Sequence, residues 1–395
     1  MNMDAANVSE TIAPELRELQ EATRDFAERE VAPVAHKLHL AGEQIPDSLL
    51  TKMQDMGIFG LLASPEFGGL GLGAMAVALV TEELSRAWFS AGALPARNWG
   101  LAMLLEKFGT PKQKRQWLPK IVSGEWQAAH SGTEPEAGSD AANIKTTATL
   151  QGGAYVVQGT KQWCTHANRA DVISLFCRTN KEHGKHGGIS LLMVPKPRGE
   201  QFVPPKLTGS RIETIGYHGM HSYMLFFDGY EVPQENLLGG GEGQGFKQLM
   251  TIYELARMQF AFRCIGLAQA AYEASIEHSR NRVQFGQAIS QFQAIRHKLA
   301  DMGTQIEAAR QLGYMVARKM DAGQRVDLEA GMVKLFASEM VQKVCQEAVQ
   351  IHGGMGFAVE TPVNRYWRDS ALATIGEGTS EIQREVIARR VLGER

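Results

Sequence analysis

The hydrophobic pattern changes twice along the chain, and this order limits the possible folds more than any single motif does. From about Pro14 to Ser123 the sequence has helical segments separated by Gly and Pro breaks. Between about Lys145 and Asn236 short β-rich runs take over, and long helical segments return after Gly245. The order helical, β, helical predicts an α+β fold that is mostly α.

The β-rich middle part contains several candidate strands. A Gln151-Gly-Gly153 break separates the first two of them and is typical of a hairpin turn. The later Gly239–Gly245 stretch has no surrounding βαβ unit, so we interpret it as a linker rather than a phosphate loop. The predicted strands are Thr146–Leu150, Ala154–Gln158, Val172–Cys177, Ile189–Val194 and Met224–Phe227.

Long helices are expected in the last part, at about 247–279, 291–321 and 328–352. With a final helix, they predict an antiparallel four-helix bundle. The third has apolar residues at three- and four-residue steps up to Gly353, which predicts one buried stripe. The stripe consists of Met332, Leu335, Phe336, Met340, Val344, Ala348 and Ile351.

The length of the chain, 395 residues, exceeds what one hydrophobic core usually supports. We therefore expect three domains. They are an N-terminal α-helical domain at 1–126, a middle β domain at 127–238 and a C-terminal helical bundle domain at 239–395.

Charge and cysteine usage exclude several classes of protein. The net charge is −2 and basic residues are not clustered, so neither nucleic acid nor an anionic membrane is an expected partner. The N-terminus has no basic region followed by an apolar run, and no apolar span is long enough for a membrane. The cysteines have no CxxC or metal-ligand spacing, so we expect a cytoplasmic protein without a metal site. They are Cys164, Cys177, Cys264 and Cys345.

One carboxylate stands between two glycines near the end of the chain, in Gly376-Glu377-Gly378. The glycines allow a sharp bend and the close approach of another molecule. Ser380 and Gln383 follow with the spacing of a capping box, which predicts the start of a helix. Glu377 would then lie in the turn before a fixed helix end, as a catalytic base would. The alternative is an acidic residue that complements the helix dipole.

A second polar segment runs from Ser131 to Asp140. Six of its ten side chains can form hydrogen bonds, and it contains two glycines. Its hydroxyls and bare amides suit a polar ligand, although a plain surface loop would also explain it.

These two segments, together with Gln350-Ile-His-Gly353-Gly354-Met-Gly356-Phe357, resemble the acyl-CoA dehydrogenase family in order and spacing. The resemblance covers nearly the whole chain. It implies the fold of that family, an acyl-CoA substrate, FAD held without a Rossmann fingerprint, a homotetramer, and an electron-transfer flavoprotein as partner. It also implies oxidation to a 2-enoyl-CoA, in which Glu377 removes the α proton and flavin N5 takes the β hydride. Burial of the Glu377 carboxylate would make it a stronger base, because burial disfavours the charged form.

The resemblance also assigns candidate flavin contacts. Ser131 and Thr133 match a loop at the flavin ring edge, while Trp163 and Thr165 match a segment that lies against the isoalloxazine. Trp163 could instead be an ordinary core residue. The residues that match a segment reaching the FAD of a neighbouring subunit are Arg282, Phe285, Phe292 and Gln293. The remaining dinucleotide contacts match Gln350, Gly353, Gly354, Thr379 and Glu381.

Candidate substrate contacts follow in the same way. Ser139 matches a serine that contacts pantetheine or phosphate, and Arg257 matches an arginine beside the thioester. Arg257 could instead form an exposed pair with Glu254, which is also the alternative base. Arg97 could pair with a second carboxylate on the acyl chain or be a solvated surface residue. Gly376 replaces a usual tyrosine, which removes a ring beside the acyl cavity.

Other departures bear on the substrate. His166 and Ala167 replace a common Asn-Gly, and Gly132 takes a usually larger apolar position. The run from Trp163 to Asp171, with Lys196-Pro-Arg198-Gly199, looks like the methylsuccinyl-CoA dehydrogenase branch. We therefore expect a short or branched acyl group, with methylsuccinyl-CoA as the candidate. The alternatives are an acyl-CoA oxidase, which is typically much longer, and a flavin-containing DNA-binding member of the family, which should display a basic face.

Overall fold

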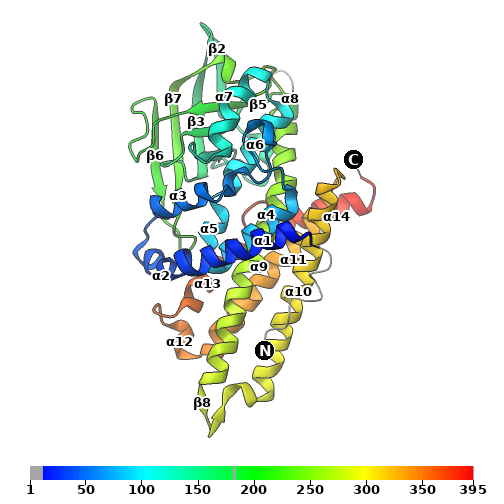
Figure 1. The fold of residues 1–395 in the computed structure, drawn as a ribbon. Coiled ribbons are helices and arrows are strands. Elements are labelled where there is room, and N and C mark those ends of the chain that lie inside the picture. The colour runs from blue at the N-terminus through cyan, green and yellow to red at the C-terminus, as the bar shows by residue number, and fades with distance from the viewer. Residues whose placement is uncertain (1–11, 181–183, 395) are drawn as a thin grey trace.

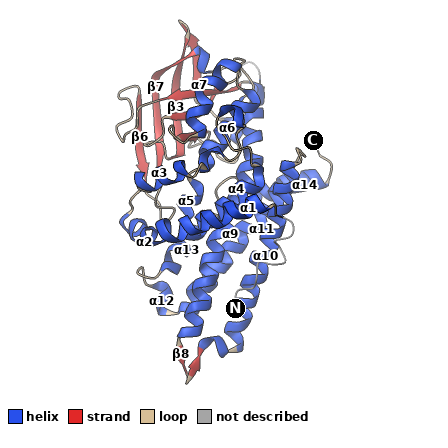
Figure 2. Cartoon of the chain, viewed as in Figure 1, coloured by secondary structure: helices blue, strands red, loops and turns tan. Residues whose placement is uncertain are grey.

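The computed structural model describes residues 12–180 and 184–394, in which helices, a sheet and further helices follow one another along the chain (Figures 1 and 2). The predicted α+β class is thereby confirmed. Within those two ranges, no helix has both the length and the apolar character needed to cross a membrane. The domain boundaries at 126/127 and 238/239 stay a prediction.

The first helical part packs around α4, whose residues from Ala74 to Ser85 are buried. The carboxylate of Asp321, from the bundle, accepts hydrogen bonds from the first α4 amides, those of Ala74 (2.5 Å) and Met75 (3.1 Å). Because Asp321 belongs to the bundle and caps the N-terminus of α4, it links the first helical part to the bundle. The helices are α1 (Pro14–Phe26), α2 (Ala32–Ala41), α3 (Asp47–Asp55), α4 (Gly73–Ala87), α5 (Phe89–Ala93), α6 (Ala96–Phe108) and α7 (Pro111–Val122).

The middle part is a seven-stranded sheet with the order β1-β4-β2-β3-β7-β6, and β5 pairs with β4. The predicted hairpin is confirmed, because Gln151 pairs with Ala154 across a loop of Gly152 and Gly153. The strands are β1 (Ala128–Ser131), β2 (Thr147–Gln151), β3 (Ala154–Thr165), β4 (Val172–Arg178), β5 (Ile189–Pro195), β6 (Leu207–Ile212) and β7 (Ser222–Pro233), and a short helix, α8 (Gly184–Gly187), precedes β5.

The last part is a helical bundle in which α9 packs against α10 and α11, and α14 packs against α11. A small hairpin, β8–β9, joins α9 to α10 and projects from the end of the bundle opposite the sheet (Figure 1). The elements are α9 (Gly245–Asn281), β8 (Val283–Gln284), β9 (Gln287–Ala288), α10 (Gln293–Asp321), α11 (Asp327–His352), α12 (Gly354–Phe357), α13 (Pro362–Ser370) and α14 (Ser380–Val391).

The predicted stripe of α11 is correct in its second half and wrong in its first. The last four members of the stripe are buried as expected, namely Met340, Val344, Ala348 and Ile351. Phe336, however, is 40% exposed, and Met332 and Leu335 are only half-buried. Because α9 and α14 both cover the start of α11, its buried face there is wider and made of smaller residues. That face consists of Ala330, Gly331, Val333, Lys334, Ala337 and Ser338.

Helix α9 joins the two ends of the molecule. Leu249 and Ile252 belong to a core shared with the sheet and with α6 and α7, whereas the core residues from Leu255 onward belong to the bundle. The change falls at the turns of α9 that carry the candidate substrate residues Glu254 and Arg257.

Candidate active site

The Glu377 carboxylate lies on a left-handed turn between α13 and α14. Glu377 has a φ of +55° and Gly378 a φ of +87°. A Cβ at position 378 would lie 2.6 Å from the side-chain amide nitrogen of Gln383, so the turn needs glycine there. The Glu377 side chain is exposed, so a single chain does not provide the burial expected around the base.

The predicted capping box is wrong by one residue. The N-cap of α14 is Thr379, whose hydroxyl accepts a hydrogen bond from the amide of Ile382 (3.3 Å), and Ser380 is the first helical residue. Gln383 instead donates its side-chain amide to the carbonyls of Glu377 and Gly378, both at 3.1 Å. Spacing alone could not distinguish Thr379 from Ser380, because both residue types form good N-caps.

A buried lysine on α11 supports the same turn, and sequence reasoning missed it. The ammonium of Lys334 donates to the carbonyl of Gly378 at 2.6 Å, and the side chain is fully buried. It lies 5.5 Å from the centre of the Phe260 ring. Burial lowers the pKa of Lys334, and the charge of Glu377 opposes that shift. The only sign of this role in the sequence was that one lysine, Lys334, stands within an apolar face of the predicted helix.

Tyr253 and Arg257 on α9 lie near the Glu377 turn, and the charge of Glu377 acts on both. For Glu254 the largest charge effect comes instead from Asp327. Arg257 is buried, and its guanidinium lies 5.6 Å from the centre of the Tyr253 ring. Burial lowers the pKa of Arg257 and raises that of Glu254. Burial, followed by the charge of Glu377, raises the pKa of Tyr253 to about 12. The alternative of an exposed Glu254–Arg257 pair is therefore wrong, because Arg257 is not at the surface.

The polar segment 131–140 is anchored from within by one ion pair. The carboxylate of Glu134 accepts hydrogen bonds from the amide of Thr146 (2.9 Å) and from the ammonium of Lys161 (2.9 Å), and all three residues are buried. Lys161 also donates to the carbonyl of Gly132 at 3.0 Å. Desolvation opposes ionisation of the pair, and the mutual attraction lowers the pKa of Glu134. The segment is therefore not a plain surface loop.

The two candidate flavin segments of the sheet lie side by side. The amide of Gln162 donates to the carbonyl of Thr133 at 2.8 Å, which places Thr133 beside the strand that carries Trp163. Trp163 has a φ of +60° at a break in the β3 register and is 50% exposed, so the core alternative is wrong. The Thr165 and Ser222 hydroxyls are 2.8 Å apart. Ser131 is buried, and Ser139 is exposed at the far end of its loop.

A second group of candidates lies away from the first. The ends of α9 and α11 meet where the rings of His278 and His352 stack at 4.2 Å, and the β8–β9 hairpin is at this end (Figure 1). Phe285 on the hairpin has a φ of +52° and is 95% exposed, and its ring lies 6.1 Å from that of Phe292. One chain thus does not bring these residues to the sheet. The group comprises Arg282, Phe285, Phe292, Gln293, Gln350, Gly353 and Gly354, whereas Thr379 and Glu381 lie with Glu377.

Arg97 lies on α6 between the helices and the sheet and is partly buried, so it is not a fully solvated residue. Its guanidinium donates to the carbonyl of Ala93 (2.8 Å) and to the hydroxyl of Tyr217 (3.4 Å). Within 12–180 and 184–394, it forms no ion pair. Burial, followed by the charge of Arg97, lowers the pKa of His130 to about 4 and that of His166 to about 3.

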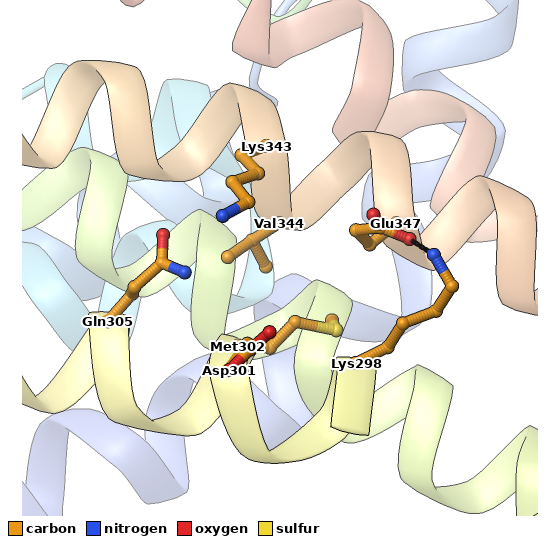
Figure 3. Close-up of a pocket in the computed structure, with 7 residues that line it drawn as sticks. All are labelled: Lys298, Asp301, Met302, Gln305, Lys343, Val344 and Glu347. Carbon is orange, nitrogen blue, oxygen red and sulfur yellow. Dashed lines mark hydrogen bonds and ion pairs between the residues drawn. The ribbon is translucent and has the colours of Figure 1, made fainter. Parts of the chain in front are cut away.

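A small pocket between α10 and α11 is separate from all these groups (Figure 3). Lys298 and Glu347 form an ion pair across it. None of the residues predicted for the site lines it. The lining residues are Lys298, Asp301, Met302, Gln305, Lys343, Val344 and Glu347.

The family models of three acyl-CoA dehydrogenase domains together match almost the whole chain. The N-terminal domain matches residues 13–125, the middle domain 129–230 and the C-terminal domain 243–392. The chain belongs to the acyl-CoA dehydrogenase family.

Individual relatives agree with this assignment. The (2S)-methylsuccinyl-CoA dehydrogenase of Cereibacter sphaeroides is 44% identical over 381 residues, which cover 96% of this chain and 70% of that protein. Butyryl-CoA dehydrogenase from Megasphaera elsdenii has a similar structure, with a TM-score of 0.91 and 33% identity over 97% of this chain and 99% of that chain. A chain from the structure of the electron transferring flavoprotein of Acidaminococcus fermentans gives a TM-score of 0.92 and 34% identity over 99% and 100%. The predicted family and enzyme class, a flavin-dependent oxidoreductase, are confirmed.

Acyl-CoA dehydrogenases are FAD-dependent flavoproteins, so the predicted cofactor is also confirmed. The residues of this chain fit such a ligand. Trp163 presents an exposed aromatic surface beside a polar segment whose shape is fixed by the Glu134–Lys161 pair. Phe285, which is 95% exposed, presents a large apolar side chain at the surface of the hairpin.

Proposed function

We propose that this acyl-CoA dehydrogenase oxidises a short, branched, carboxylated acyl-CoA, with methylsuccinyl-CoA as the substrate, to the 2-enoyl-CoA. Glu377 is the base that removes the α proton. The observation that carries this role is its position on a turn fixed by Lys334 and Gln383, opposite the α9 face of Tyr253 and Arg257. FAD, when bound, supplies the acceptor for the β hydride at flavin N5.

The chain's own residues hold the cofactor in two places. Ser131, Thr133, Trp163 and Thr165 bind the flavin of the same chain. Thr379 and Glu381 complete the contacts near the base. The hairpin and the end of α11 contribute to the FAD of a neighbouring chain, through Arg282, Phe285, Phe292, Gln293, Gln350, Gly353 and Gly354. The separation of these groups and the exposure of Phe285 support a homotetramer, because isologous pairing lets two chains complete each other's sites.

Arg97 and Gly376 select the acyl group. Among residues 12–180 and 184–394 the Arg97 guanidinium pairs with no carboxylate, so it is available for the second carboxylate of a dicarboxylic acyl group. At Gly376, a Cβ would only reach ordinary contact, 3.5 Å from Leu372 and from Phe260, so the missing side chain leaves room for a branch. Glu254 and Arg257 lie beside the thioester, and Ser139 contacts the CoA. The similarity to the Cereibacter sphaeroides enzyme supports the choice of methylsuccinyl-CoA.

An electron-transfer flavoprotein accepts the electrons in this proposal. The similarity to a chain in the structure of the Acidaminococcus fermentans electron transferring flavoprotein supports this partner. An acyl-CoA oxidase would instead pass them to O₂. A DNA-binding role is disfavoured by the net charge of −2.

An anaerobic titration of the FAD-loaded enzyme with a panel of acyl-CoA thioesters tests the proposal. We expect methylsuccinyl-CoA to bleach the flavin band fastest, butyryl-CoA more slowly and palmitoyl-CoA least. Fastest bleaching by palmitoyl-CoA would contradict the proposed substrate. Rapid reoxidation of the reduced enzyme by air, without the partner flavoprotein, would favour the oxidase.

A further inference from the structure

Lys334 is a charged side chain with no contact to solvent in the middle of the bundle. Burying an ammonium is costly unless hydrogen bonds and neighbouring charges offset the loss of water. Its ammonium donates a hydrogen bond to the Gly378 carbonyl at 2.6 Å, and the centre of the Phe260 ring lies 5.5 Å away. A lysine that only filled space here would be less stable than a methionine. The hydrogen bond to the turn therefore indicates that Lys334 has a role other than filling space in the core.

The turn that Lys334 holds is unfavourable for its central residue. Glu377 is not a glycine, yet its φ of +55° lies in the left-handed region, which costs an ordinary residue on the order of 1 kcal/mol. Three hydrogen bonds to its carbonyls offset this strain, one from Lys334 and two from Gln383. Removing Lys334 leaves Gln383 as the remaining side-chain donor to these carbonyls.

The charges around Lys334 come from every element packed against it. Glu377 precedes α14, Glu381 lies in the first turn of α14, and Arg257 faces it from α9. Cys264, also on α9, is buried, and burial raises its pKa to about 12, so its thiol stays neutral. Lys334 is thus a buried cation beside the Glu377 carboxylate, with Arg257 as the second cation.

We propose that Lys334 is a positioning residue for the catalytic base: its hydrogen bond to the Gly378 carbonyl fixes the turn that carries the Glu377 carboxylate. This inference rests on the proposed function, because it takes Glu377 as the base. The hydrogen bond fixes where the carboxylate lies relative to the substrate, so its loss should lower the rate of proton removal more than the binding of acyl-CoA.

Amide hydrogen exchange of the FAD-loaded enzyme tests, without substrate, whether Lys334 holds the turn. The reporter amides are those of Ser380, which donates to the Thr374 carbonyl at 3.0 Å, and of Gln383, which donates to the Thr379 carbonyl at 2.9 Å. In Lys334→Met we expect the peptide spanning 374–383 to exchange about 10-fold faster than in the wild type. Lys343→Met is the matched control, because Lys343 is an exposed lysine on the same helix (Figure 3).

Stopped-flow flavin reduction tests whether the position of the base matters for catalysis. In Lys334→Met we expect a 10- to 100-fold lower limiting rate with unchanged acyl-CoA affinity, since a small misplacement of a base costs rate rather than binding. In Gln383→Leu we also expect a lower rate with unchanged affinity, because Gln383 donates to the carbonyls of the same turn.

Distinct outcomes overturn the inference. Wild-type exchange of the 374–383 peptide together with a wild-type limiting rate in Lys334→Met contradicts it. If that variant does not bind FAD, Lys334→Gln, with a smaller change in polarity, takes its place, and wild-type exchange and rate there overturn the inference. If no acyl-CoA bleaches the wild-type flavin, the proposed function fails, while the exchange comparison still decides whether Lys334 holds the turn.

Discussion

Two buried lysines hold two backbone segments of the candidate active site, and they differ in what neutralises them. Lys161 donates to the Gly132 carbonyl and also pairs with the buried carboxylate of Glu134 at 2.9 Å. Lys334 donates to the Gly378 carbonyl, but in the described parts of the chain it forms no ion pair. Lys161 is thus neutralised by an internal carboxylate, whereas Lys334 is a buried cation whose hydrogen bond goes to the turn.

The difference indicates that Lys161 stabilises the fold, whereas Lys334 serves the chemistry of the active site. Because Glu134 neutralises Lys161, that pair fixes the shape of the 131–140 segment and leaves little charge for a ligand. Breaking such a buried pair is strongly destabilising, since it leaves an uncompensated charge inside the protein. Lys334 forms no such ion pair in the described parts of the chain, and its hydrogen bond holds the turn that carries Glu377. Substitutions at the two sites should therefore separate stability from catalysis.

The largest effect is expected from Glu377→Gln, which removes the base and keeps its size. Flavin reduction by methylsuccinyl-CoA should fall by about 10²–10⁴-fold, because glutamine cannot accept the α proton. FAD content and the melting temperature should stay near wild type, since the hydrogen bonds to the Glu377 and Gly378 carbonyls are unchanged. Stopped-flow bleaching of the flavin measures the rate. Reduction at the wild-type rate would redirect the search to Glu254.

Lys161→Met should give the opposite result, a loss of stability rather than of chemistry. It leaves the Glu134 carboxylate buried without its cation, which is expected to lower the free energy of unfolding by about 3–5 kcal/mol. FAD affinity should fall as the 131–140 segment loosens. Chemical denaturation of the wild type and the variant measures the difference.

Lys145→Met is the matched control, because Lys145 pairs with Glu136 at the surface beside the same segment. No measurable change is expected for it. Equal stability of Lys161→Met and the wild type would remove the contrast between the two lysines.

The sequence was sufficient for the parts of this fold that depend on local patterns. The helical, β, helical order, the Gly152-Gly153 hairpin and the long helices follow from periodicity and turn residues. Strand β1 (Ala128–Ser131) was missed because four residues carry no alternation, and β6 (Leu207–Ile212) because its edge position leaves it mostly polar. Local patterns do not reveal β1 because its partner, β4, lies more than forty residues further along the chain, as the pairing of Ala128 with Val172 shows.

The same limit explains what was missed at the site. The Glu377 turn and the 131–140 segment are marked by glycines and polar residues that stand close together in sequence. The two lysines that hold them, Lys161 and Lys334, are separated from the carbonyls that they bind by 29 and 44 residues. No spacing rule connects such positions, so only the folded chain shows that these charges are buried.

Arg97 extends the comparison to a third cation, which, like Lys334, forms no ion pair in the described parts of the chain. Arg97→Met should lower kcat/KM for methylsuccinyl-CoA by about 10- to 100-fold, which corresponds to a charged hydrogen bond of roughly 1.5–3 kcal/mol. The value for butyryl-CoA, which has no second carboxylate, should change little. Steady-state kinetics with both thioesters measure the ratio. An equal loss for the two substrates would show that Arg97 acts on the fold and not on the second carboxylate.

The smallest effect concerns His166, which follows the strand that carries Lys161 and Trp163. Its side chain is 2% exposed, and neither ring nitrogen has a hydrogen-bond partner within the described residues 12–180 and 184–394. Burial, then the charge of Arg97, lowers its pKa to about 3. The unfolded chain takes up a proton near pH 6.5 but the folded chain does not, so stability is lost as the pH falls from about 6.5 toward 3. At pH 5 this amounts to about 2 kcal/mol. His166→Asn removes the proton uptake, and asparagine tolerates the φ of +70° at this position. Melting curves at pH 7.5 and 5 should therefore show the variant losing less stability than the wild type, while His297→Asn, at an exposed position on α10, should follow the wild type. A wild type and His166→Asn that lose stability in parallel would show that His166 is protonated in the folded protein.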